Sequence, residues 1–155
     1  MARRWRRRAS RVPDADASCA VVSKLTNCVM MRGEKRVAAR LVYKALAHIQ
    51  AVVGVGALKT LFEAVDNVTP YMEVRSVKVG GVSYQIPIDV APKRRLGLAI
   101  RWIVAAARRR REAPMWAKLA GELVDSALGR SEACRKREAV RQLVDANQAF
   151  SHMGW

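Results

Sequence analysis

The sequence predicts a mainly α-helical protein, a bundle of about six helices with a protruding two-stranded β-hairpin arm between the third and fourth helices. Three observations lead to this prediction. Apolar residues recur at helical spacing through most of the chain. Only residues 71–90 alternate with period two, and glycine or proline separates the periodic segments. At 155 residues we expect a basic flexible arm at 1–17 and one helical domain at 18–155, with the hairpin at 71–90.

The N-terminal segment is strongly basic. Residues 1–11 contain six arginines, Trp5 and no acidic residue. Such composition is typical of a disordered arm that contacts nucleic acid, and Trp5 could stack on a base. A remnant of an organelle-targeting sequence remains open as the alternative, since those sequences are also rich in arginine and poor in acid.

The first helix is expected to run to about Arg32, capped by Asp16 or Ser18 and followed by Gly33. The second should run from about Lys35 to Val52 and end at Gly54 and Gly56. We expect its core-facing stripe to be Val37, Leu41, Val42, Leu46 and Ile49. A basic stripe with four-residue spacing should face outward and comprises Arg36, Arg40, Lys44 and His48.

The third helix should span about residues 57–67 and stop before Thr69-Pro70. We expect it to bury Leu58, Leu61, Phe62 and Val65. The arm follows, with Gly80-Gly81 suited to a two-residue turn that needs positive φ. Pro87 has no N–H to donate, so its strand should lie at a sheet edge or be locally unpaired. A lone hairpin is marginal in water, so this arm needs a helical base or a ligand.

The last three helices are expected at about 92–110, 114–128 and 131–149. Inward residues of the fourth should be Leu96, Ile100, Ile103, Val104 and Ala107, and those of the fifth Trp116, Leu119, Ala120, Leu123 and Val124. Arg94, Arg101 and Arg108 repeat every seven residues on the opposite side of the fourth helix, with Trp102 alongside. The sixth mixes apolar residues with Arg135, Lys136, Arg137 and Arg141.

Charge gives the first indication of function. The chain has 29 Lys and Arg against 13 Asp and Glu, a net charge of +16. Self-repulsion of this size is tolerated when a polyanion neutralises it, and nucleic acid is the usual one. An anionic membrane surface is the weaker alternative, and no apolar run approaches the roughly 20 residues of a transmembrane helix. Arginine exceeds lysine, which favours bidentate phosphate contacts and stacking on bases.

Enzymatic and metal-binding signals are weak. Cys19, Cys28 and Cys134 are widely spaced and form no C-x-x-C pair, which argues against a zinc site or a disulfide framework and favours reduced thiols. Neither histidine has a sequence-local partner that suggests a triad. Glu122 and Asp125, three apart on one helix, are expected to form salt bridges or caps. We therefore expect no catalytic site, no metal and no cofactor.

Three segments, in order, resemble the universal small-subunit ribosomal protein seven family of the bacterial and organellar type. They are VGGVSYQIPIDV, RRLGLAIRWIVAAARRR and KREAVRQLVDANQAFSHMGW. The similarity extends from about Arg11 to Trp155 and includes KLTNCVMMRGEKRVAARLVYKAL and AKLAGELVDSALG. The resemblance implies a helical body with a protruding hairpin, in agreement with the periodicity.

The resemblance also implies a function: a structural, non-catalytic protein that binds the 3′ major (head) domain of small-subunit rRNA and nucleates head assembly. It implies a position near the exit (E) site and the mRNA exit channel. The implied partners are rRNA, nearby mRNA and exit-site tRNA, and neighbouring proteins including protein eleven, without membrane or DNA. The hairpin tip at Gly80 and Gly81 should lie near the exit-site tRNA. The implied RNA-binding residues are Arg3, Arg4, Arg6, Arg7, Arg8, Lys35, Arg36, Arg75, Lys78, Arg94, Arg95, Arg101, Arg108, Arg109, Arg110, Lys136, Arg137, Asn147 and His152.

Departures from the family pattern bear on the compartment. Glu34 occupies one place of a usual lysine pair, Val77 precedes Lys78 where adjacent basic residues are common, and the chain ends Met153-Gly154-Trp155. These differences favour a diverged organellar member, in the mitochondrial matrix or a plastid, over one in the bacterial cytoplasm.

Two other function classes remain as alternatives. A histone-like architectural protein would also use a basic hairpin, but such arms usually carry an apolar wedge at the tip, where this chain has Gly80-Gly81. An RNA-modifying enzyme is disfavoured because the sequence shows neither a cofactor loop nor a nucleophile constellation.

Overall fold

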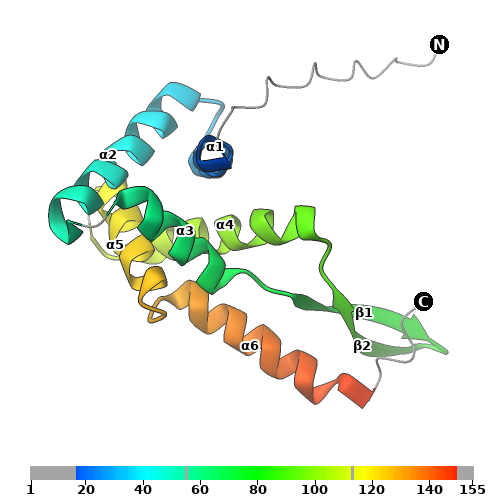
Figure 1. Cartoon of the computed structure of the whole chain (residues 1–155). Helices are drawn as coiled ribbons and strands as arrows, with labels where there is room; N and C mark the ends of the chain where they lie inside the picture. Colours follow the sequence, from blue (N-terminus) through cyan, green and yellow to red (C-terminus); the bar gives the residue numbers. More distant parts are fainter. Residues whose placement is uncertain (1–16, 55, 113, 150–155) are drawn as a thin grey trace, which may run out of the picture.

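A computed structural model of the chain describes residues 17–54, 56–112 and 114–149. The described residues form six helices and one two-stranded antiparallel sheet, as predicted. The helices are α1 (Ala17–Val29), α2 (Lys35–Val53), α3 (Ala57–Val68), α4 (Pro92–Arg109), α5 (Met115–Ala127) and α6 (Glu132–Ala146). The strands β1 (Met72–Val79) and β2 (Val82–Asp89) lie between α3 and α4 (Figure 1).

Helix α5 is the central element of the core, because it packs against α2, α3 and α4. Its inward side chains Leu119 and Leu123 have no exposed surface, in agreement with the predicted stripe. Helix α1 packs against α2 and α4, and α6 packs against α4 and α3. These contacts bury one apolar cluster to which the five helices α1–α5 and the start of α6 contribute.

Two predicted core positions are wrong. Val37 on α2 is 48% exposed and Leu58 on α3 is 44% exposed. The buried stripe of α2 instead passes through Ala38 and Ala45, and that of α3 through Ala57 and Ala64. The buried positions at these places are small alanines, and the larger aliphatic neighbours Val37 and Leu58 face solvent.

The hairpin has the predicted strands and turn. Val79 pairs with Val82, and the intervening Gly80 and Gly81 have φ of 58° and 86°, the left-handed region that favours glycine. Pro87 pairs with Val74 in a sheet whose strands are both edges, as expected for a residue without an N–H.

The arm does not stand alone at its base. Ile86 and Val90 are each 1% exposed, and β1 packs against α6, which runs beside the hairpin in Figure 1. The tip half is more exposed, with Val82 at 55%. The helical body therefore orders the root of the hairpin and leaves the tip projecting.

Helix ends differ from prediction at two places. Helix α1 ends at Val29 rather than near Arg32, because Arg32 itself has a positive φ of 52° and forms a turn with Gly33. Helix α6 ends at Ala146, three residues earlier than expected. Its start is capped as a Ser N-cap should be, with Ser131 Oγ accepting the backbone N–H of Cys134 at 3.1 Å. The predicted Asp16 cap lies outside the described residues.

Candidate nucleic-acid interface

The basic stripe of α2 is confirmed as an outward face. Arg36, Arg40, Lys44 and His48 are all exposed. The ion pairs of the described residues include no carboxylate bound to these cations. Lys35, also exposed, extends the stripe to the helix start. At the other end the His48 ring lies 5.2 Å from that of Trp116. Helix α2 thus presents uncompensated positive charge along most of its length.

The arm carries cations on both of its faces. Arg75 and Lys78 are exposed residues of β1, opposite Ile86 and Ser83 respectively. Since side chains alternate along a strand, positions three apart face opposite sides of the hairpin. Arg75 and Lys78 therefore cannot both contact one flat surface, although a strand of RNA passing around the arm could meet both.

The first turn of α4 joins the arm to the body. Arg94 Nη2 donates to Glu73 Oε2 on β1 at 2.9 Å. Arg95 Nε donates to the carbonyl of Val90 at 2.9 Å, and its guanidinium lies over the ring of Tyr71, 5.0 Å from the centroid. These two arginines, predicted as RNA contacts, also fix the direction in which the hairpin leaves the body.

Further along α4 the cations have mixed surroundings. Arg101 is exposed and bonds only within its own helix, from Nε to the carbonyl of Gly97 at 3.1 Å. Arg108 Nη2 lies 3.4 Å from the carbonyls of Cys28 and Val29, so it caps the end of α1. Arg109 is paired with Glu132 at the start of α6.

Arg110 has the least exposed side chain of the arginines in the described ion pairs. Its Nε donates to Glu112 at 2.9 Å, and its Nη1 donates to Glu122 at 2.9 Å and Asp125 at 2.7 Å. These hydrogen bonds, that to Glu112 first, raise the pKa of Arg110 above its ordinary value although burial lowers it. The same bond holds the pKa of Glu112 below its usual range. Glu122 and Asp125 thus have the predicted salt-bridge role.

The α6 residues show a similar division. Lys136 is exposed and lies 5.3 Å from the centroid of the Trp102 ring. Arg137 is half-buried and donates to the carbonyl of Asn67 at 2.5 Å. Asn67 in turn donates to the carbonyls of Ser126 and Ala127, so Arg137 belongs to a polar junction of α3, α5 and α6. The amide of Asn147 donates to the carbonyl of Leu143 within its own helix end, at 2.7 Å.

Some predicted contacts lie outside the described residues, namely Arg3, Arg4, Arg6, Arg7, Arg8 and His152. The candidate set also left out Arg40 and Lys44, although their spacing with Arg36 was visible. It missed a cleft between β1 and α6, for which no local pattern exists because its walls lie about 70 residues apart in the chain.

Within the described ranges, no cluster of three or more His, Cys, Asp or Glu side chains could hold a metal ion. No single helix there is long and apolar enough to cross a membrane. Helices α2 and α3 taken together, with a bend at the break between them, have the length and composition of a membrane span.

Comparison with known proteins gives the family. Residues 1–148 match the family described as Ribosomal protein S7p/S5e. The chain belongs to this family. It is 46% identical over 144 residues to the small ribosomal subunit protein uS7 of Parvibaculum lavamentivorans, covering 93% of this chain and 92% of that protein. It is 48% identical over 143 residues to uS7 of Paramagnetospirillum magneticum, covering 92% of each.

Membership in S7p/S5e makes the chain a ribosomal protein, as the resemblance implied. The match favours this class of protein over the histone-like and RNA-modifying alternatives. The uS7 relatives named here, and that of Bartonella henselae at 47% identity, are bacterial. They do not favour the organellar compartment that the departures in sequence suggested, so that expectation is without support.

Proposed function

We propose that the chain is a structural, non-catalytic constituent of the small ribosomal subunit that binds the 3′ major (head) domain of the rRNA and nucleates head assembly. The observation that carries the proposal is the spread of exposed cations over α2, the hairpin, α4 and α6. Among the described ion pairs, none compensates Arg36, Arg75, Lys78 or Arg101.

The physical basis is counterion release. Each phosphate neutralised by a cation frees condensed ions, so affinity rises with the number of contacts and falls with salt. Because the cations lie on elements that face different directions, they suit a junction where several RNA helices converge. Recognition would then depend on the shape of the RNA and on its backbone.

The contacts within the protein divide the proposed lysines and arginines of the described residues into three groups. The first faces outward and we assign it to RNA: Lys35, Arg36, Arg75, Lys78, Arg101 and Lys136. The second can bind phosphate while it holds neighbouring elements: Arg94, Arg95, Arg108 and Arg109. The third, Arg110 and Arg137, is directed inward and we assign it a structural role.

The projecting tip at Gly80-Gly81 supports a second part of the proposal. We place it near the exit-site tRNA and the mRNA exit channel, with protein eleven as a neighbour of this region. A turn without side chains can approach a nucleic-acid backbone closely, which suits such a position.

Binding to a transcribed head-domain fragment of small-subunit rRNA across a salt series tests the proposal, with unrelated structured RNA and duplex DNA as competitors. We expect preference for the head fragment to persist as salt rises. Equal affinity for all three polyanions, falling together with salt, would contradict site recognition. Preference for duplex DNA would support an architectural DNA-binding protein instead.

A further inference from the structure

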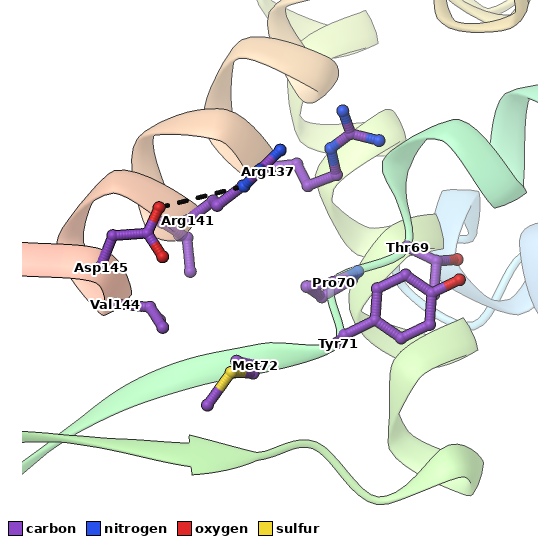
Figure 2. A pocket seen from close by; sticks show the side chains of 9 residues that line it. Thr69, Pro70, Tyr71, Met72, Arg137, Arg141, Val144 and Asp145 are labelled. Carbon is purple, nitrogen blue, oxygen red and sulfur yellow. Dashed lines mark ion pairs between the residues drawn. The ribbon is translucent and has the colours of Figure 1, made fainter. Parts of the chain in front are cut away.

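A cleft of about 350 Å³ lies between the start of β1 and α6 (Figure 2). Residues 69–72 form one wall, and residues of α6 from Arg137 to Asp145 form the other. Val144 points from α6 toward β1, and it and Pro70 are buried. The walls are therefore mainly apolar and already in place, as in many small-molecule sites.

The rim of the cleft is polar and offers both donors and acceptors. Arg141 and Asp145 lie side by side on α6, with Nε and Oδ2 4.0 Å apart and side chains 70% and 67% exposed. An exposed ion pair at this separation contributes little to stability. Either side chain can therefore leave the pair and bind a ligand at a small cost in free energy. Arg137, another lining residue, bonds through Nη1 to Asn67 and keeps further N–H donors.

The carboxylate at this rim needs an explanation. The chain has a net charge of +16, and the neighbouring surface is the one we assign to RNA. A carboxylate facing a phosphate would weaken binding through repulsion. Within an RNA partner, a carboxylate strengthens binding where it accepts hydrogen bonds from the N–H groups of a base, and guanine presents two adjacent donors, N1–H and N2–H, on one edge.

We propose that this cleft binds an unstacked guanine of single-stranded RNA. The apolar walls contact the faces of the base, Asp145 accepts from N1–H and N2–H, and Arg141 donates to O6. Unstacked bases held between side chains and read on their edges are the usual mode of sequence-specific RNA recognition. The inference rests on the proposed RNA-binding function and adds base selectivity at a stated place.

The test measures anisotropy of the labelled pentamers UUGUU, UUAUU, UUCUU and UUUUU with the full chain at one salt concentration. We expect UUGUU to bind about tenfold more tightly than the others, the order expected of one bidentate pair. Asp145→Asn should remove this preference, since an amide cannot accept two N–H bonds. Val140→Phe, which narrows the cleft, should remove it too, with folding checked by circular dichroism.

Asp66→Asn is the matched control, because it makes the same change of charge at an exposed residue of α3 that does not line the cleft. It should keep the preference. Equal binding of all four RNAs, or a preference that Asp145→Asn leaves intact, would overturn the proposal and leave the cleft to an apolar side chain of a neighbouring protein. Either result is distinct from failure of the proposed function, which is judged by the head-domain fragment.

Discussion

Arginines of one sequence run have opposite roles in this molecule. Arg108–Arg111 look equivalent in sequence, yet Arg110 alone turns inward to three carboxylates. One of these, Glu122, is 2% exposed, and its second oxygen, Oε1, lacks a hydrogen-bond partner among the described residues. A buried carboxylate depends on its cation, so the stability of the α4–α5 junction should depend on Arg110 more than on any exposed arginine.

Arg110→Ala should therefore lower the free energy of unfolding by about 3 kcal/mol, because it removes the cation from the buried carboxyl group of Glu122. Chemical denaturation at pH 7 measures the change. Arg111→Ala is the control, since Arg111 is exposed, and should change stability by less than about 0.5 kcal/mol. Equal losses of unfolding free energy in the two variants would show that the ion pairs of Arg110 do not stabilise the fold more than an exposed arginine does.

The Arg110–Glu112 pair should make stability depend on pH on the acid side. The folded-state pKa of Glu112 is lowered, chiefly by its hydrogen bond to Arg110. The stabilisation is then complete above the ordinary pKa of a glutamate and is lost as pH falls through the lowered folded value. The difference in stability between the parent chain and Glu112→Gln should shrink in that window, measured by denaturation between neutral and acid pH. A constant difference would contradict the assignment.

At the scale of the element, two helix-interior glycines have different neighbours. A Cβ on Gly97 of α4 would meet nothing within 4 Å, whereas one on Gly121 of α5 would lie 3.0 Å from Arg110 Nη2 and 3.2 Å from its Cζ. Because three carboxylates hold that guanidinium, it cannot move aside freely. Gly121 thus allows the arginine to lie flat against α5.

Gly97→Ala should stabilise the protein by about 0.5–1 kcal/mol, the usual gain for glycine replaced in a helix interior. The free energy of unfolding of Gly121→Ala should be lower than that of Gly97→Ala by about 1 kcal/mol or more. The gain in helix propensity at Gly121 is offset because the new Cβ displaces Arg110. Denaturant midpoints of the two variants, measured with the parent, make the comparison. The same stabilisation in both variants would show that the Arg110 side chain moves aside without cost.

The elements that the sequence predicted well are those with local signals. Period-two alternation and Gly80-Gly81 predicted the hairpin, and helical spacing with Gly54 and Pro92 placed the helices. Val37 was misplaced because Val37 and Ala38 are adjacent and both apolar, so the sequence pattern does not show which of the two faces the core. The partners of Arg137 could not be predicted, since Asn67 is 70 residues away and no periodicity links them.

At the scale of the whole molecule, the proposed surface is distributed over several elements, so removing any one cation should weaken RNA binding only in part. Arg75, Lys78 and Arg101 are suited to removal because none of them is bonded to another element by the hydrogen bonds and ion pairs described above.

The triple substitution of Arg75, Lys78 and Arg101 to Gln should weaken binding to the head fragment and reduce the slope of log affinity against log salt by about 2 to 3, close to one for each phosphate that is no longer neutralised. Lys59→Gln, at an exposed lysine of α3 outside the proposed surface, should leave the slope unchanged. Unchanged binding of the triple variant in the salt series would show that the hairpin and α4 do not meet RNA.

The central place of α5 has a consequence for the order in which the protein is made. Helices α2, α3 and α4 share α5 as their packing partner, and α6, which braces β1, follows α5 in the chain. A nascent chain emerging N-terminus first therefore exposes its arginine-bearing hairpin before the helices that support it exist. During synthesis the hairpin is therefore cationic before it is supported, and it takes its final orientation only when α4 and α6 have packed against it.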